Sequence, residues 1–180
     1  VVALQHGFNA HSGYFQWVAD QLVALNYAVY AVDLRGRGQS DGERFYVDDI
    51  ADYTSDLSAL IQVAKAREPG KPIFLLGHSA GGVTAVTYAL DNQQQLAGLI
   101  CESFAFQVPA PDFALAALKG LAHIAPHAHV LALKNADFTR DPAALKRMNE
   151  DPLIAHETQP TRTVAALARA DDRLKKDFAR

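Results

Sequence analysis

Short apolar runs alternate along the chain with stretches of helical periodicity. Four runs lack the polar alternation of half-exposed strands, and these are Val1–Gln5, Ala28–Val32, Ile73–Leu76 and Ala97–Cys101. Strands with this pattern are covered on both faces, as in a parallel sheet. Between the runs, Val18, Leu22 and Leu25 recur at helical spacing, and a longer apolar stripe extends from Ile50 to Ala64. The pattern predicts an α/β fold with crossover helices.

The pattern changes after Glu102. Residues 105–160 are rich in Ala, Pro and His, and they predict helical pieces but no convincing strand. Asp141-Pro142 is typical of a helix N-cap followed by proline at the first helical position. We expect residues 1–104 to form the N-terminal part of a core and 105–160 a helical cap. Residues 161–180 are then expected to form a helix that returns to the core.

Composition narrows the class of protein. The chain has 180 residues, of which 49% are hydrophobic, so it is long enough for one domain with a substantial core. A formal net charge of −3 gives no electrostatic case for binding nucleic acid. No apolar run approaches the about 20 residues of a transmembrane helix. The single cysteine, Cys101, excludes an intrachain disulfide and a cysteine-based zinc site, and no metal or cofactor is expected.

The two ends of the sequence bear on its completeness. Val1 is not Met, and the first five residues already resemble a core strand. The last six residues are expected to lie in or just after a charged helix, with no strand behind them. We therefore expect an internal piece of a longer chain whose N-terminus is missing. No secretory signal is present, which is weak evidence in such a piece, and a cytoplasmic location is favoured.

One short motif carries the main chemical signal. Gly77-His78-Ser79-Ala80-Gly81 matches G-x-S-x-G, with an apolar strand running into it and a helix leaving it. A serine in such a turn must adopt a strained backbone, and side chains two residues away on either side would collide. The motif predicts a nucleophile elbow with Ser79 as the nucleophile. The competing interpretation is a tight glycine turn with an incidental serine.

The loop after the first strand supplies a second signal. His6-Gly7-Phe8 follows that strand, and in this architecture such a loop lies beside the elbow. The backbone N–H groups of Phe8 and Ala80 could converge on a substrate carbonyl oxygen as an oxyanion hole. Gly7 would allow the close approach that this requires.

Four segments together resemble a known family. They are His6-Gly7-Phe8, His11-Ser12-Gly13, the stretch from Asp33 to Arg44, and Gly77–Gly82. They resemble the monoacylglycerol lipase group of α/β-hydrolases, a group also labelled lysophospholipase or serine aminopeptidase-like. The stretch from Asn149 to Leu153 is similar to a short segment of that group's cap. The resemblance implies an α/β-hydrolase fold, whose third to sixth strands lie in the order fourth, third, fifth, sixth. It also implies that residues 105–160 form the lid over an acyl pocket.

Three positions depart from the family pattern. The family's oxyanion loop carries an acidic residue and an arginine that hold the glycerol end, and the matching positions here are Ala10 and Tyr14. A cap tyrosine of the family is replaced by Met148. Losing polar groups built to hydrogen-bond a hydroxyl weakens the case for glycerol esters. An esterase is therefore favoured over a monoglyceride lipase.

A serine nucleophile needs a histidine base and an acid that orients it. In the family, the acid follows the seventh strand and the histidine follows the eighth, so both are expected beyond Arg180. No histidine within the chain is a good substitute, and His78 is expected to point away across the turn. Glu102, which follows the last predicted strand, is the alternative acid. Three helical carboxylates are expected to be solvated: Asp171, Asp172 and Asp177.

Two functions from different classes remain open. The first is a cofactor-free serine hydrolase that cleaves carboxylic esters through an acyl-serine intermediate. Its partner would be a small-molecule acyl ester, either monoacylglycerol- or lysophospholipid-like or a small acyl ester. The second is a non-catalytic binding protein that kept the fold and lost the triad. Two weaker patterns are not assigned to binding sites. Gly36-Arg37-Gly38 is interpreted as a tight loop and not as a dinucleotide-binding loop. The histidines from His123 to His129 are interpreted as part of the inserted segment and not as a metal site.

Overall fold

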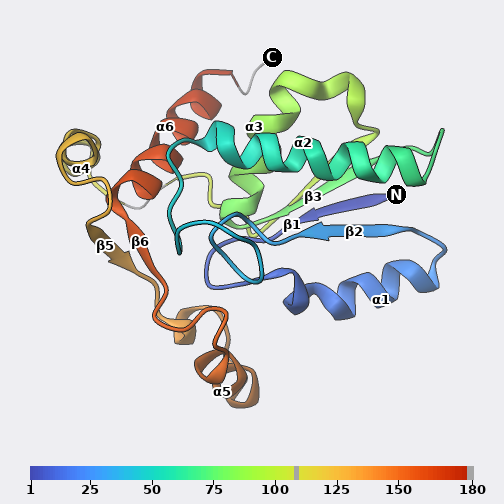
Figure 1. Cartoon of the computed structure of the whole chain (residues 1–180), viewed down its shortest axis with the longest axis horizontal. Coiled ribbons are helices and arrows are strands. Elements are labelled where there is room, and N and C mark those ends of the chain that lie inside the picture. The colour runs from blue at the N-terminus through green and yellow to red at the C-terminus, as the bar shows by residue number, and fades with distance from the viewer. Residues whose placement is uncertain (108–109, 178–180) are drawn as a thin grey trace.

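The centre of the molecule is a four-stranded parallel sheet (Figure 1). The computed structural model describes residues 1–107 and 110–177. The strands are β1 (Val2–Gln5), β2 (Val29–Val32), β3 (Phe74–His78) and β4 (Gly98–Glu102). They lie in the order β2-β1-β3-β4, and every neighbouring pair is parallel. The four predicted strands are confirmed, and their order is the one that the family resemblance implied.

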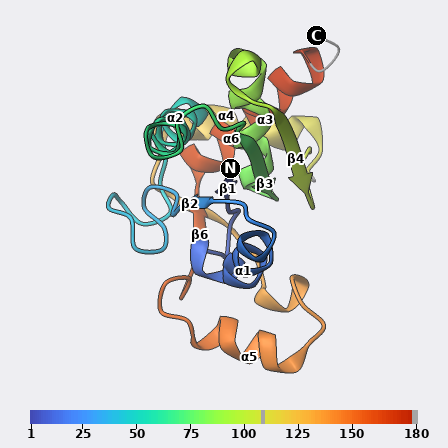
Figure 2. The same cartoon turned by 90° about the vertical axis from the view of Figure 1, so that its right-hand side faces the viewer.

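Helices cover both faces of this sheet. Helix α1 (Gln16–Ala24) lies on one face, and α2 (Ile50–Arg67) and α3 (Ala80–Asn92) lie on the other (Figures 1 and 2). The Asp49 side chain caps α2 by accepting a hydrogen bond from the Ala51 N–H at 3.0 Å. From α2, Leu57 and Ile61 are fully buried in the cluster that also contains Leu75 of β3. The uniformly apolar strands are therefore covered where α2 and α3 pack on them.

The inserted segment, residues 105–160, was expected to contain helices but no strand. This expectation was wrong, because the segment contains both. It contains α4 (Asp112–Ile124), a 3₁₀ helix η3 (Asn135–Asp137) and α5 (Pro142–Glu150), whose cap Asp141 accepts a hydrogen bond from the Ala143 N–H. It also contains two antiparallel strands, β5 (His129–Ala132) and β6 (Thr158–Pro160). These strands are four and three residues long, and their pairing has a register irregularity. No hairpin turn joins them, so no local pattern marks them in the sequence.

The last helix, α6 (Thr161–Asp177), begins directly after β6 and packs against α3 and α4 (Figure 1). Its apolar side chains Val164, Leu167 and Leu174 are buried. The Thr163 hydroxyl donates a hydrogen bond to the Phe45 carbonyl oxygen at 3.1 Å and accepts one from the Val47 N–H at 2.9 Å. These contacts attach α6 to the segment between β2 and α2.

Strand β4 lies at one edge of the sheet (Figure 2). Leu99 and Ile100 on this strand are 38% and 47% exposed, which is high for apolar residues of a central α/β sheet. A cavity of about 310 Å³ between α3 and β4 is lined by apolar side chains that include Leu90 and Leu96. The strand order that the family resemblance implied also places residues 97–101 at one edge of these four strands.

Candidate active site

Ser79 occupies a sharp bend between β3 and α3. Its backbone has φ 53° and ψ −122°, a conformation that costs a non-glycine residue about 1–3 kcal/mol. The Ser79 N–H donates a hydrogen bond to the Glu102 carbonyl oxygen at 3.0 Å, and the Ser79 carbonyl oxygen accepts one from the Gly82 N–H at 2.9 Å. These contacts fix the strained turn between the end of β4 and the start of α3. The side chain is partly exposed, as a nucleophile would have to be.

Glycine is required on both sides of this bend. A Cβ built on Gly81 would lie 2.4 Å from the carbonyl oxygens of Gln5 and His6. A Cβ on Gly77 would lie 2.7 Å from the Ala85 Cβ and from the Gly81 carbonyl oxygen. The contacted atoms are mainly backbone oxygens, which cannot move without a shift of the chain, so a larger residue at either position would displace the turn. The glycines therefore allow α3 to begin directly against the end of β1.

The loop after β1 presses on the same bend. A Cβ built on Gly7 would lie 2.8 Å from the Ser79 Cβ and 3.2 Å from the Ala80 nitrogen. Phe8 and Ala80 are each 6% exposed, and both line one cavity together with Ser79. Ala80 is the first residue of α3, so its N–H lies at the helix end that favours negative charge. The structure thus brings together the serine and the two residues predicted to supply the oxyanion hole.

His6 holds this loop in place without carrying charge. Its Nε2 accepts a hydrogen bond from the Leu34 N–H at 2.9 Å, so the proton is assigned to Nδ1, which donates to the Gly7 carbonyl oxygen at 2.7 Å. Burial is the main cause that lowers the pKa of His6 to about 4; the positive charge of Arg37 acts in the same direction, and the hydrogen bond to Gly7 opposes them. His6 is therefore neutral near pH 7 and joins the loop after β1 to the loop after β2.

A cavity of about 160 Å³ opens beside Ser79. Its walls are mostly apolar and come from the loop after β1, α3, the inserted segment and α6; they include Phe8, Val83, Leu131, Leu133, Val164 and Leu167. Leu131 lies on β5 and Leu133 directly follows it, so the inserted segment closes one side. The arrangement offers an apolar recess next to the serine.

Asp171 also lines this cavity, which the sequence analysis missed. The residue is only 3% exposed, so the expectation that it is solvated was wrong. Asp172, in contrast, is exposed and pairs with Lys119. Asp171 lies four residues after Leu167 and three before Leu174, on the buried stripe of α6. That spacing was the signal that could have placed it.

Within the described part of the chain, no histidine side chain forms a hydrogen bond with Ser79. His78 Nε2 pairs with Glu102 Oε2 at 3.1 Å, and the His78 ring packs edge-on against Phe15. Glu102, the alternative acid, is largely exposed and also accepts a hydrogen bond from the Ser103 hydroxyl. The Glu102 carboxylate therefore contacts His78 and Ser103.

Two of the three residues that depart from the family pattern line a second cavity. Tyr14 and Met148 line a space of about 710 Å³ between η1 (Ser12–Phe15) and α5, whereas Ala10 is buried. The Tyr14 hydroxyl donates to Asp151 Oδ2 at 2.7 Å, and His11 Nε2 lies 2.9 Å from the same oxygen. Burial opposes ionisation of Asp151, but these hydrogen bonds outweigh it and hold the pKa of the carboxyl below its usual value.

Residues 1–107 and 110–177 contain neither a metal-binding cluster nor a membrane-spanning helix. No group of three or more His, Cys, Asp or Glu side chains in these ranges is arranged to hold a metal ion. Within the same ranges, no helix is both long enough and apolar enough to cross a membrane.

Comparison with known proteins identifies the family. The family model described as "Serine aminopeptidase, S33" matches residues 1–180. The "Monoglyceride lipase homolog" of Monkeypox virus is 30% identical over 177 residues, covering 98% of this chain and 64% of that protein. The "Monoacylglycerol lipase" of Mycolicibacterium smegmatis is 32% identical over 174 residues, covering 94% of this chain and 60% of that protein.

A solved structure gives the same result. The monoacylglycerol lipase of Paleococcus ferrophilus is 30% identical, and its structure matches with a TM-score of 0.85 over 98% of this chain and 67% of that one. The chain spans less than two thirds of the length of the two curated relatives. With its strand order and its elbow at Ser79, the chain has the α/β-hydrolase fold and belongs to the serine aminopeptidase S33 family.

Proposed function

We propose that this chain is the nucleophile-bearing part of a serine hydrolase that cleaves carboxylic esters through an acyl-serine intermediate. The observation that carries the proposal is the strained Ser79 turn at the start of α3, with the Gly7–Phe8 loop pressed against it and an apolar cavity beside it. The names of the relatives, which are lipases, support the same reaction class.

Each part of the site has a role in this proposal. The Ser79 hydroxyl attacks the ester carbonyl, and the N–H groups of Phe8 and Ala80 stabilise the oxyanion that forms. One such donor is worth roughly 10²–10³ in turnover in comparable enzymes. The alcohol leaves, and water then releases the acyl group from Ser79. The base and the acid, as the family resemblance implies, are a histidine and an aspartate in segments that follow residue 180.

We further propose that residues 105–160 act as a lid over the acyl site. Support comes from Leu131 and Leu133, which belong to this segment and line the Ser79 cavity. Closing an apolar wall over a reacting ester excludes water and strengthens the hydrogen bonds to the oxyanion. No cofactor is part of this proposal, and the small-molecule ester is the only partner that it needs.

The substrate that we favour is an ester with a small or medium acyl chain. A cavity of about 160 Å³ holds roughly five water volumes, which suits a short apolar chain. Ala10 stands where the family has an acidic residue for glycerol, so small esters are favoured over monoacylglycerols or lysophospholipids. Tyr14 stands where the family has an arginine for glycerol, and its hydroxyl proton is already donated to Asp151.

The test is ester hydrolysis by the intact protein. We measure hydrolysis of a p-nitrophenyl ester series from acetate to dodecanoate, and of a monoacylglycerol and a lysophospholipid. We expect the short and medium acyl esters of the series to be hydrolysed fastest. Ser79→Ala is expected to reduce turnover by roughly 10⁶, as removal of the nucleophile does in a serine protease. Ser55→Ala, on the exposed face of α2, is the matched control and should retain full activity. A folded wild-type protein with no activity would instead favour the binding-protein alternative.

A further inference from the structure

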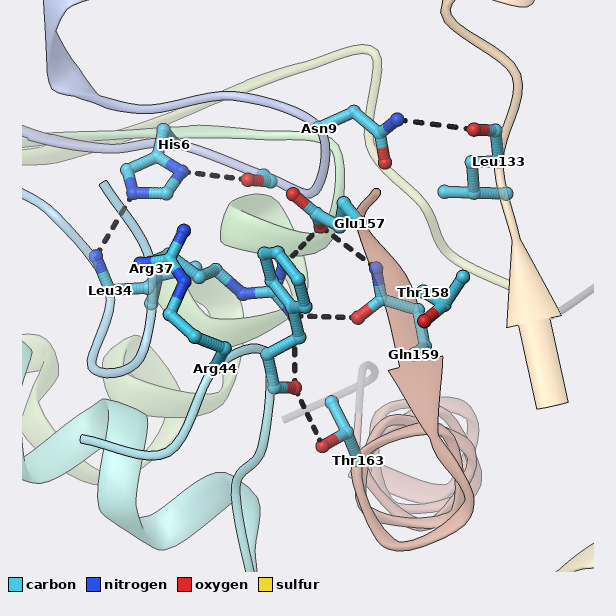
Figure 3. Close-up of polar contacts among 12 residues, drawn as sticks. His6, Asn9, Leu34, Arg37, Arg44, Leu133, Glu157, Thr158, Gln159 and Thr163 are labelled. Carbon is cyan, nitrogen blue, oxygen red and sulfur yellow. Dashed lines mark hydrogen bonds and ion pairs between the residues drawn. The ribbon is translucent and has the colours of Figure 1, made fainter. Parts of the chain in front are cut away.

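A buried ionic cluster contacts the loop after β1, which contains Gly7, Phe8 and Asn9 and is called the oxyanion loop below. It consists of Arg37, from the loop after β2, Glu157, which directly precedes β6, and Gln159, in the middle of β6 (Figure 3). The Arg37 guanidinium donates to Glu157 Oε1 and, at 2.6 Å, to Gln159 Oε1. Gln159 Nε2 in turn donates to Glu157 Oε1 at 2.8 Å. The Arg37 and Glu157 side chains are each only 1% exposed.

The guanidinium of this cluster contacts the oxyanion loop itself. Its central carbon lies 4.0 Å from the centroid of the Phe8 ring, within the range of a cation–π contact. A further donor of Arg37 lies 3.3 Å from the Phe45 carbonyl oxygen, which fixes the plane of the group. Because Phe8 also lines the Ser79 cavity, its side chain lies between the cluster and the acyl recess.

The next residue of the loop is also held by the inserted segment. Asn9 has φ 49°, and its Nδ2 donates to the Leu133 carbonyl oxygen at 3.1 Å (Figure 3). The same Nδ2 donates to Asn135 Oδ1 at 2.9 Å. Two successive residues of the oxyanion loop, Phe8 and Asn9, are therefore connected to residues beyond 130. Phe8 reaches β6 through Arg37, and Asn9 reaches the chain after β5 directly.

The energetics make a purely stabilising role a poor explanation of this cluster. Burying an ion pair removes two charges from water, and apolar residues of similar volume often give equal or greater stability. The cluster instead fixes the orientation of the Arg37 guanidinium, because a planar group with several fixed hydrogen-bond partners has one orientation. A ring in contact with this guanidinium is restricted in its orientation as well.

We propose that Arg37 and Glu157 are positioning residues that hold Phe8 so that its N–H points at the oxyanion. Through Glu157 and Gln159, the conformation of the inserted segment is coupled to the oxyanion hole. This inference rests on the proposed ester hydrolysis, because it assigns a task within that reaction. Neither side chain needs to touch the substrate.

The experiment uses the intact protein and two single variants, Glu157→Gln and Arg37→Lys. Each is expected to lower kcat for a p-nitrophenyl ester by roughly 10- to 100-fold, because displacing an oxyanion donor by a fraction of an ångström costs transition-state stabilisation. KM should change by less than about threefold, because ground-state binding to the cavity is retained. The affinity for a trifluoromethyl ketone, which forms a tetrahedral adduct with serine, should fall by the same factor as kcat.

Two controls separate positioning from folding. Arg35 lies in the same loop as Arg37 and forms partly exposed ion pairs with Asp52 and Asp56 of α2. Arg35→Met removes these pairs and should leave kcat within about twofold of wild type. The triple variant Arg37→Met, Glu157→Leu, Gln159→Leu fills the space with apolar side chains and should unfold at nearly the wild-type temperature while kcat stays low.

The outcomes are distinct. A triple variant with wild-type kcat and wild-type ketone affinity would overturn the positioning role, since the cluster would then serve only packing. Single variants that lose thermal stability but keep kcat would overturn it as well. A wild-type protein that hydrolyses no ester would refute the proposed function, and this inference with it.

Discussion

The contact between Gly7 and Ser79 allows a sharp prediction for the substitution Gly7→Ala. The added Cβ would lie 2.8 Å from the Ser79 Cβ and 2.9 Å from the His78 carbonyl oxygen, whereas ordinary contacts begin at 3.4 Å. The loop must therefore move away from the elbow by about 0.6 Å. Since a misplacement of about 1 Å can cost 10²-fold in rate, we expect kcat for ester hydrolysis to fall roughly 10- to 100-fold.

The matched control is the same substitution elsewhere in the chain. A Cβ on Gly120, in α4, would meet nothing within 4 Å, so Gly120→Ala should leave kcat unchanged and stabilise the helix by about 0.5–1 kcal/mol. The assay is steady-state hydrolysis of a p-nitrophenyl ester, with thermal unfolding measured on the same samples. If Gly7→Ala retains wild-type kcat, the oxyanion loop does not press on the elbow as described.

Two further predictions concern pH and acyl preference. His6 has a pKa of about 4 in the folded state and 6.5 in the unfolded state. Between pH 6.5 and pH 4, the His6 imidazole is therefore protonated in the unfolded state but neutral in the folded state. About 3 kcal/mol of stability should therefore be lost between pH 6.5 and pH 4, and urea unfolding across that range should show a flatter profile for His6→Gln. Asp171→Leu should raise kcat/KM for hexanoate over acetate esters by roughly 3- to 10-fold, because it completes the apolar wall of the cavity. Asp172→Leu, on the exposed face, should leave that ratio unchanged, and an unchanged ratio in both variants would contradict this account of the cavity.

The core of the fold was predictable because its signals are local. Each strand is a continuous apolar run, and the G-x-S-x-G motif around Ser79 requires glycines for steric reasons that the structure makes explicit. The cap at Asp141 follows from the same kind of local chemistry. Such signals depend on neighbouring residues, so they can be identified without knowing the tertiary contacts.

The features that were missed depend on distant partners. Strands β5 and β6 are stabilised by pairing across more than 20 residues, and neither is long enough to show a period. The ionic cluster joins Arg37 to Glu157, which lie 120 positions apart in the chain. Asp171 could have been assigned to the buried stripe of α6 from its spacing, but its polarity favoured the solvent-exposed interpretation.

The central claim is that Ser79 is an activated nucleophile, and covalent labelling tests it most directly. The intact protein is treated with a fluorophosphonate, and the modified residue is located by mass spectrometry of its peptides. The account predicts one adduct, on the Ser79 Oγ, and no adduct in Ser79→Ala. A folded wild-type protein that is not labelled, or that is labelled at another serine, would contradict it.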